Sequence, residues 1–121
     1  MSLAPTSIST SITITPQIIV VETTITLNLS PSIVEPNKTF TWSGKLRRTD
    51  GQNPSIQTIR LLINGTVTDS TICDSNGNFT ATEGAPAADG SYSYKSYFGG
   101  ATLGLERLEA SISPQIMLWG K

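Results

Sequence analysis

A turn followed by a strand with aromatic residues at alternate positions is the feature that most constrains the fold. Residues 89–100 read D-G-S-Y-S-Y-K-S-Y-F-G-G, and Tyr92, Tyr94 and Phe98 fall on one face of an extended chain. Because successive side chains of a strand point to opposite faces, three aromatic residues on one face need a second layer to cover them. This stretch therefore predicts a central strand of a β-sandwich.

The rest of the chain shows the same two-residue period. No window of eleven or more residues has the apolar spacing of a helix, whereas several short segments alternate apolar and polar residues between turn sequences. About seven strands at intervals of roughly 8 to 12 residues favour an all-β antiparallel sandwich over a closed barrel. The inward sets are Ile25, Leu27 and Leu29; Phe40, Trp42 and Leu46, with a gap at Gly44; Ile59, Leu61 and Ile63; Phe79 and Ala81; Leu108, Ala110 and Ile112; and Ile116 and Leu118, with Met117 and Trp119 opposite.

Turn sequences separate these strands. Asn64-Gly65 is a strong signal for a tight hairpin, because both positions tolerate the positive φ angles that such turns need. The cluster at 49–54 predicts a loop, and the segment 74–78, D-S-N-G-N, predicts another turn. Between Thr66 and Cys73 the alternation is ambiguous, since Val67 and Ile72 fall on opposite faces.

The first 21 residues are predicted to be an N-terminal extension or linker strand, and residues 22–121 the sandwich domain. Ile8, Ile12 and Ile14 alternate with hydroxyl residues, but Pro16 cannot donate to a β-ladder, which favours a sheet edge or a link between domains. The segment 14–18, I-T-P-Q-I, is echoed at 112–116 by I-S-P-Q-I, 98 residues later. One interpretation is that the chain comes from a tandem array of sandwich domains; the other is coincidence in a Thr- and Ile-rich sequence.

Composition argues against several function classes. Eight basic and nine acidic residues give a net charge of −1 with no basic run, so nucleic acid is not an expected partner. No apolar run approaches the ~20 residues that cross a bilayer, so no membrane insertion is expected of this chain. A single cysteine permits no internal disulfide, and the absence of histidine removes the commonest metal ligand and general base.

No catalytic, cofactor-binding or metal site is predicted, and the chain is not expected to be an enzyme. Asp74, Asn76 and Asn78 have the spacing of calcium ligands, but the loop lacks the required Gly at position six and Glu at position twelve. Glu106 and Glu109 lie beside Arg107 on an edge-like strand and are expected to be solvated, and Cys73 is expected to be a small semi-buried hydrophobic residue. The four lysines, Lys38, Lys45, Lys95 and Lys121, show no spacing typical of a catalytic base.

Several segments together resemble the immunoglobulin-like (Ig-like) repeats of prokaryotic cell-surface and secreted proteins. They are T-L-N-L-S-P at 26–31, F-T-W-S-G-K-L at 40–46, R-L-L-I-N-G-T at 60–66, D-S-N-G-N-F at 74–79, and D-G-S-Y-S-Y at 89–94 with F-G-G at 98–100. The resemblance implies an extracellular or cell-surface module with a structural or binding role. It also implies that Tyr92 forms a tyrosine corner, and that an aromatic contact, Tyr94 with Trp42, takes the place of the disulfide of antibody domains.

Two function classes remain open. The first is a structural spacer or assembly unit that contacts neighbouring Ig-like domains or identical subunits, for example by pairing of an edge strand. The second is an adhesion module for a carbohydrate or protein, whose exposed aromatic platform would need Tyr97 and Trp119. Four N-x-S/T sequons, at Asn28, Asn37, Asn64 and Asn78, are compatible with glycosylation or with chance.

Overall fold

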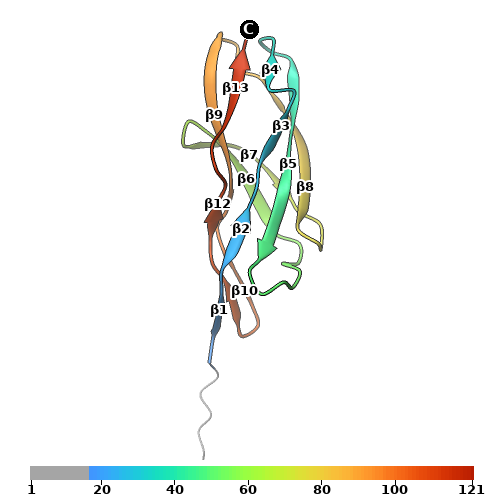
Figure 1. Cartoon of the computed structure of the whole chain (residues 1–121), viewed down its shortest axis with the longest axis vertical. Coiled ribbons are helices and arrows are strands. Elements are labelled where there is room, and N and C mark those ends of the chain that lie inside the picture. Colours follow the sequence, from blue (N-terminus) through green and yellow to red (C-terminus); the bar gives the residue numbers. More distant parts are fainter. Residues whose placement is uncertain (1–16) are drawn as a thin grey trace, which may run out of the picture.

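The computed structural model describes residues 17–121, and Ile14, Thr15 and Pro16 of the sequence echo lie outside this range. Within it the chain is all-β and forms two packed sheets and a small third one (Figure 1). Residues 17–121 contain no helix of the length and hydropathy needed to span a bilayer. The first sheet contains β2 (Thr23–Ile25), β3 (Asn28–Ser30), β5 (Thr39–Arg48) and β8 (Asn78–Gly84). The second contains β4 (Ile33–Val34), β13 (Ile116–Gly120), β9 (Gly90–Phe98), β6 (Thr58–Ile63) and β7 (Thr66–Ile72), with β12 (Ser111–Ile112) also paired to β9.

This architecture confirms the predicted Ig-like β-sandwich. If the broken first strand β2–β3 counts as one, the two main sheets hold seven strands of three or more residues. The aromatic strand β9 lies between β13 and β6, as a central strand should, and buries Tyr94 and Phe98 while Tyr92 is half-buried. The alternation of the sequence therefore predicted both the position and the inward face of β9.

The aromatic contact between the two sheets forms, but with a different partner from the predicted one. Tyr94 of β9 meets Phe40 of β5 edge to face, with ring centroids 5.2 Å apart. Trp42, two residues further along β5, instead packs on Phe79 of β8 at 5.9 Å. The prediction that Tyr94 contacts Trp42 was therefore wrong, because the partner is the preceding inward residue of β5, Phe40. Which residue of β5 lies opposite Tyr94 depends on how the two sheets cross, and the alternation within a strand does not determine this.

The gap predicted at Gly44 allows the first strand to approach β5 closely. A Cβ atom at this position would lie 2.1 Å from the carbonyl oxygen of Thr26 and 2.6 Å from the ring of Phe79. Thr26 lies at the break between β2 and β3, where its carbonyl accepts a hydrogen bond of 3.0 Å from the buried Ser96 hydroxyl of β9. The break thus replaces a ladder bond with a bond to the opposite sheet.

The predicted turns are present and have the expected backbone. Asn64 and Gly65 join β6 to β7 with φ angles of 49° and 86°, the positive pair that a type I′ hairpin requires. Asp74 Oδ1 accepts bonds from the amides of Asn76 and Asn78, both at 2.9 Å, so this carboxylate holds its own turn. The Tyr92 hydroxyl donates to the carbonyl of Ala88 at 2.6 Å, which confirms the tyrosine corner.

The inward face predicted for residues 108–112 was wrong after its first member. Leu108 is buried, but Ala110 and Ile112 are exposed, and Ser113 is buried instead. The chain leaves one sheet and joins another between residues 108 and 111, which reverses the alternation. Buried polar groups need partners, and the Ser113 hydroxyl has one, since it accepts a 2.8 Å bond from the Ser96 amide.

A third sheet of three short strands lies at the end of the molecule where the described chain begins. Its order is β1 (Ile19–Val21), β11 (Glu106–Leu108) and β10 (Ala101–Leu103), and β1 runs parallel to β11. Val21 is buried in the common core. The division of the chain at residue 21 stays a prediction, although residues 19–21 form a strand paired with residues 106–108.

A buried arginine joins this third sheet to the sandwich. The Arg48 side chain, at the end of β5, binds both carboxylate oxygens of Asp50, at 3.0 and 2.5 Å, and also the Glu106 carboxylate of β11. The bond from Arg48 lowers the pKa of Asp50. The expectation that Glu106 is solvated was thus only partly right, because its side chain is half-buried and paired with a residue distant in sequence. Glu109 forms an exposed ion pair with Arg107, at 3.3 Å.

Protonation of Glu83 should make the protein more stable at mildly acidic pH than at neutral pH. Glu83 of β8 is half-buried, and burial, followed by the charge of Asp69, raises the pKa of its carboxyl above the ordinary 4.5. The folded state then binds this proton more tightly than the unfolded state, so the stabilisation is complete below pH 4.5 and is lost as the pH rises through the folded-state pKa. Melting temperatures measured by circular dichroism should therefore rise as the pH falls from 8 towards 4.5, and Glu83→Gln should reduce this rise. Equal pH dependence in both proteins would contradict the assignment to Glu83.

Candidate interaction site

The two residues of the predicted aromatic platform do not come together. Trp119 of β13 is exposed and pairs with Ser91 of β9, whereas Tyr97 is half-buried and lies six residues further along β9. At roughly 3.3 Å per residue the two positions are about 20 Å apart. No shared aromatic surface results, so a binding site must be sought elsewhere.

All four sequon asparagines are exposed. Asn37 and Asn64 occupy turn positions with positive φ, and the Asn64 side-chain oxygen accepts a 3.1 Å bond from the amide of Ser93. Asn28 and Asn78 lie on the outer face of the first sheet, where they line a groove. Whether any of the four carries a glycan stays a prediction.

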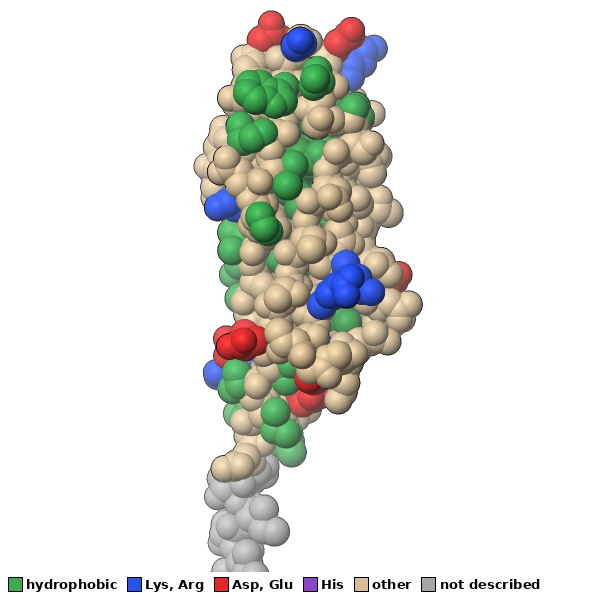
Figure 2. Space-filling view, viewed as in Figure 1, with side chains coloured by type: hydrophobic (Ala, Val, Ile, Leu, Met, Phe, Trp, Pro, Cys, Tyr) green, Lys and Arg blue, Asp and Glu red, His purple; other side chains and the backbone are tan. Residues whose placement is uncertain are grey.

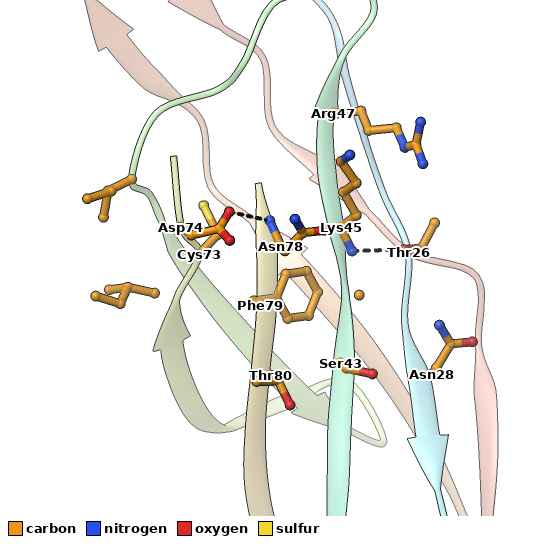
Figure 3. A pocket seen from close by; sticks show the side chains of 13 residues that line it. Thr26, Asn28, Ser43, Lys45, Arg47, Cys73, Asp74, Asn78, Phe79 and Thr80 are labelled. Atoms are coloured by element: carbon orange, nitrogen blue, oxygen red, sulfur yellow. Dashed lines mark hydrogen bonds between the residues drawn. The ribbon is translucent and has the colours of Figure 1, made fainter. Parts of the chain in front are cut away.

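This groove, of about 810 Å³, is the candidate interaction site (Figure 3). Its floor is the outer face of β5 and β8, and one side is formed by the broken first strand β2–β3. The loop before β6 and the end of β7 form the other side. Its volume is in the range of natural ligand sites.

Short polar side chains form rows across the floor. The ladder registers place Asn28, Ser43 and Thr80 in one row across three strands, and Lys45 beside Asn78 in the next. Opposite side chains in such rows are about 5 Å apart, so their hydroxyl and amide groups can contact one ligand together. The Thr26 hydroxyl accepts a bond of 3.0 Å from the backbone amide of Lys45, which fixes the edge of the first strand against β5.

The groove also contains two positively charged side chains. Lys45 and Arg47 are on the same face of β5, and Figure 2 shows basic side chains gathered over this strand. Neither forms an ion pair with any residue between 17 and 121. Asp74 is the acidic residue that lines the groove, and one of its oxygens already accepts the two amide bonds of its turn.

The far side of the groove is apolar. Ile56 and Ile72 are both exposed there, and Cys73 lies beneath them, more fully buried than the semi-buried position that was expected. Burial raises the pKa of the Cys73 thiol, and its sulfur contacts the backbone amide of Gln57 at 3.3 Å and the carbonyl of Ser55 at 3.4 Å. A thiol so placed acts as a packing group, which leaves hydrogen bonds and charge as the chemistry of the groove.

Sequence reasoning missed this site. The outward polar positions of the strand segments form no motif along the sequence, and the cations at positions 45 and 47 belong to no basic run. Their gathering in one groove depends on the register of β5 with β3 and β8.

Comparison with known proteins supports the fold. No model of a protein family matches the sequence, and no curated protein matches it either. Among solved structures, the solution structure of the CARDB domain of PF1109 from Pyrococcus furiosus is similar, with a TM-score of 0.60 and 16% identity over 84% of this chain and 96% of that one. A crystal structure of the same domain with di-metal ions gives a TM-score of 0.53 and 15% identity over 83% and 93%. The chain therefore shares the Ig-like β-sandwich fold of these archaeal domains.

Proposed function

We propose that the chain is a non-catalytic structural module of an extracellular or cell-surface protein, joined at its two ends to neighbouring Ig-like domains or identical subunits. The observation that carries this proposal is the position of the ends. β1 lies at one end of the long axis and the C-terminus at the other (Figure 1). Modules joined in this way extend a protein with each copy, as a spacer or a fibre requires.

Exposed apolar side chains at both ends support this proposal (Figure 2). Ile18, Ile19 and Val20 are exposed on and beside β1, with Leu105 in the adjacent hairpin. β1 pairs with β11 on one side, and no other described strand pairs with its free edge, where an added strand could bind. At the other end Ile33 and Trp119 are neighbours in the β4–β13 ladder and both are exposed.

The metal ions of one solved CARDB domain are not part of this proposal. A metal site needs several carboxylate, imidazole or thiolate ligands that converge on one point. Among residues 17–121 no three Asp, Glu, Cys or His side chains are grouped in this way.

The role of the N-terminal end can be tested by light scattering. If the residues that precede β1 supply the strand that pairs with β1 of a neighbouring copy, a variant that lacks residues 1–17 should be monomeric, although it keeps β1 and the buried Val21. Val20→Thr should weaken the same association, whereas Val67→Thr, at an equally exposed position of β7 (53% against 50%), should not. If the full chain is itself a monomer, strand pairing between identical subunits is excluded and the spacer arrangement remains.

The spacer arrangement has its own test. Two copies of residues 17–121 joined in series should show almost twice the maximum dimension of one copy in small-angle X-ray scattering. A folded-back pair with a dimension close to that of a single copy would overturn the proposed end-to-end arrangement.

A further inference from the structure

The outer face of the first sheet carries only positive charge. Its four strands contain four charged residues: Lys45, Arg47, Arg48 and Glu83. Arg48 is buried and paired with Asp50 and Glu106. Glu83 is half-buried and belongs to the inner face, because it alternates along β8 with the exposed, outward residues. Lys45 and Arg47 are thus the charged groups that this face presents, in a protein whose net charge is −1.

We propose that the groove over β5 and β8 binds an acidic oligosaccharide, whose carboxylate or sulfate groups pair with Lys45 and Arg47. Sugar hydroxyls both donate and accept hydrogen bonds, and the groove offers side chains that do the same, at Asn28, Ser43 and Thr80. Charged hydrogen bonds from the two cations supply the stronger contacts. The exposed Ile72 at the apolar side can cover the C–H face of a sugar ring.

The ratio of charged to neutral groups favours a sugar over a polyphosphate chain. Nucleic acids are bound chiefly through many phosphate contacts, each matched by a basic side chain. Here two cations lie among hydroxyl and amide groups, and the one carboxylate of the lining, Asp74, accepts two backbone amides of its own turn through one oxygen. So few charges among neutral polar groups match a ligand with few acidic groups among many hydroxyls. Phe79, the aromatic residue that lines the groove, is only 4% exposed, so its ring is not available for the stacking that single-stranded nucleic acids use.

The groove is also largely fixed before any ligand binds, which lowers the cost of binding. The bond between the Lys45 amide and Thr26 holds β5 against the first strand. On the other side, Asp74 holds the amide of Asn78 at 2.9 Å and so sets the start of β8. Most floor residues belong to strands, so only the long side chains of Lys45 and Arg47 need to be ordered.

Calorimetric titration tests this inference. The protein should be made in a host that attaches no N-glycans, so that Asn28 and Asn78 are bare. Hexasaccharides of polygalacturonate (carboxylated), chondroitin sulfate (sulfated) and cellulose (neutral) are the probes. We expect at least one acidic probe to bind and the neutral one not to bind, and the acidic probe that binds identifies the acidic group.

Matched charge variants test the assignment to the two cations. Lys45→Gln with Arg47→Gln should weaken binding by at least about tenfold, about 1.4 kcal/mol, because the variant loses both charged hydrogen bonds to the acidic groups of the ligand. Lys38→Gln with Lys121→Gln removes two exposed positive charges outside the groove and should leave the affinity unchanged. Circular dichroism confirms that both variants are folded.

Three results would overturn the inference. They are no binding of either acidic probe, equal loss of affinity in both double variants, and inorganic sulfate that competes as well as the sulfated probe, which would indicate a simple anion site. Binding by the groove does not depend on what the two ends contact. Failure here would therefore leave the end-to-end proposal intact, and the scattering results would leave the groove untouched.

Discussion

Replacing Gly44 with alanine should lower the free energy of unfolding by about 3 kcal/mol or more, enough to unfold a marginally stable domain. The added Cβ would lie 2.1 Å from the Thr26 carbonyl oxygen, far inside van der Waals contact. That oxygen cannot simply move away, because it is held by the Ser96 hydroxyl of the opposite sheet. The clash therefore forces a backbone shift in β5 or the loss of a bond that ties the two sheets together.

Gly84→Ala is the matched control for this variant. Gly84 ends β8 with no atom within 4 Å of the position a Cβ would take, and its φ is not in the left-handed region. The same added methyl group should change stability by less than about 1 kcal/mol there, in the stabilising direction, because alanine restricts the unfolded chain. Both effects are measured by urea unfolding followed by circular dichroism. Equal stabilities of the two variants would contradict the role of Gly44 in the close approach of the first strand.

Alternation predicted the two main sheets because their faces differ in polarity. Phe40, Trp42 and Leu46 are all fully buried, and Ile59 and Leu61 are too, since each strand has one face on the core. Turn chemistry was equally readable, because Asn64-Gly65 can supply two positive φ angles at little cost. These are local properties, and the sequence contains them without reference to distant partners.

The errors arose where two distant segments decide the structure. Ile112 is exposed and Ser113 buried because the Ser96 amide bonds to the Ser113 hydroxyl, a pairing across 17 residues. Glu106 is held by Arg48 across 58 residues. Neither bond is visible in a local pattern. The first accounts for a buried polar side chain next to a position where a hydrophobic one was expected to be buried, and the second pairs a carboxylate that was expected to be solvated.

Trp42→Ala should lower the free energy of unfolding by about 3–5 kcal/mol, because it removes the largest fully buried side chain and leaves a cavity between the sheets. Trp42→Phe should cost much less. The indole Nε1 has no hydrogen-bond partner among the described residues, so the phenyl ring loses volume but no hydrogen bond. Urea unfolding should be followed by circular dichroism, since these variants lose the buried tryptophan, whose emission would report on the core, and keep the exposed Trp119.

The second tryptophan provides the matched control. Trp119 is 51% exposed on β13, against 0% for Trp42, so Trp119→Ala should change the stability of the monomer by less than about 1 kcal/mol. The fluorescence of this variant then comes from Trp42 alone, and a core position predicts blue-shifted emission that moves to longer wavelength on unfolding. If Trp42→Phe cost as much as Trp42→Ala, the indole nitrogen would have to form a hydrogen bond that is not found among residues 17–121. If Trp119→Ala were the more damaging change, the apolar surface at the C-terminal end would be part of the core of this module and not a surface for its neighbour.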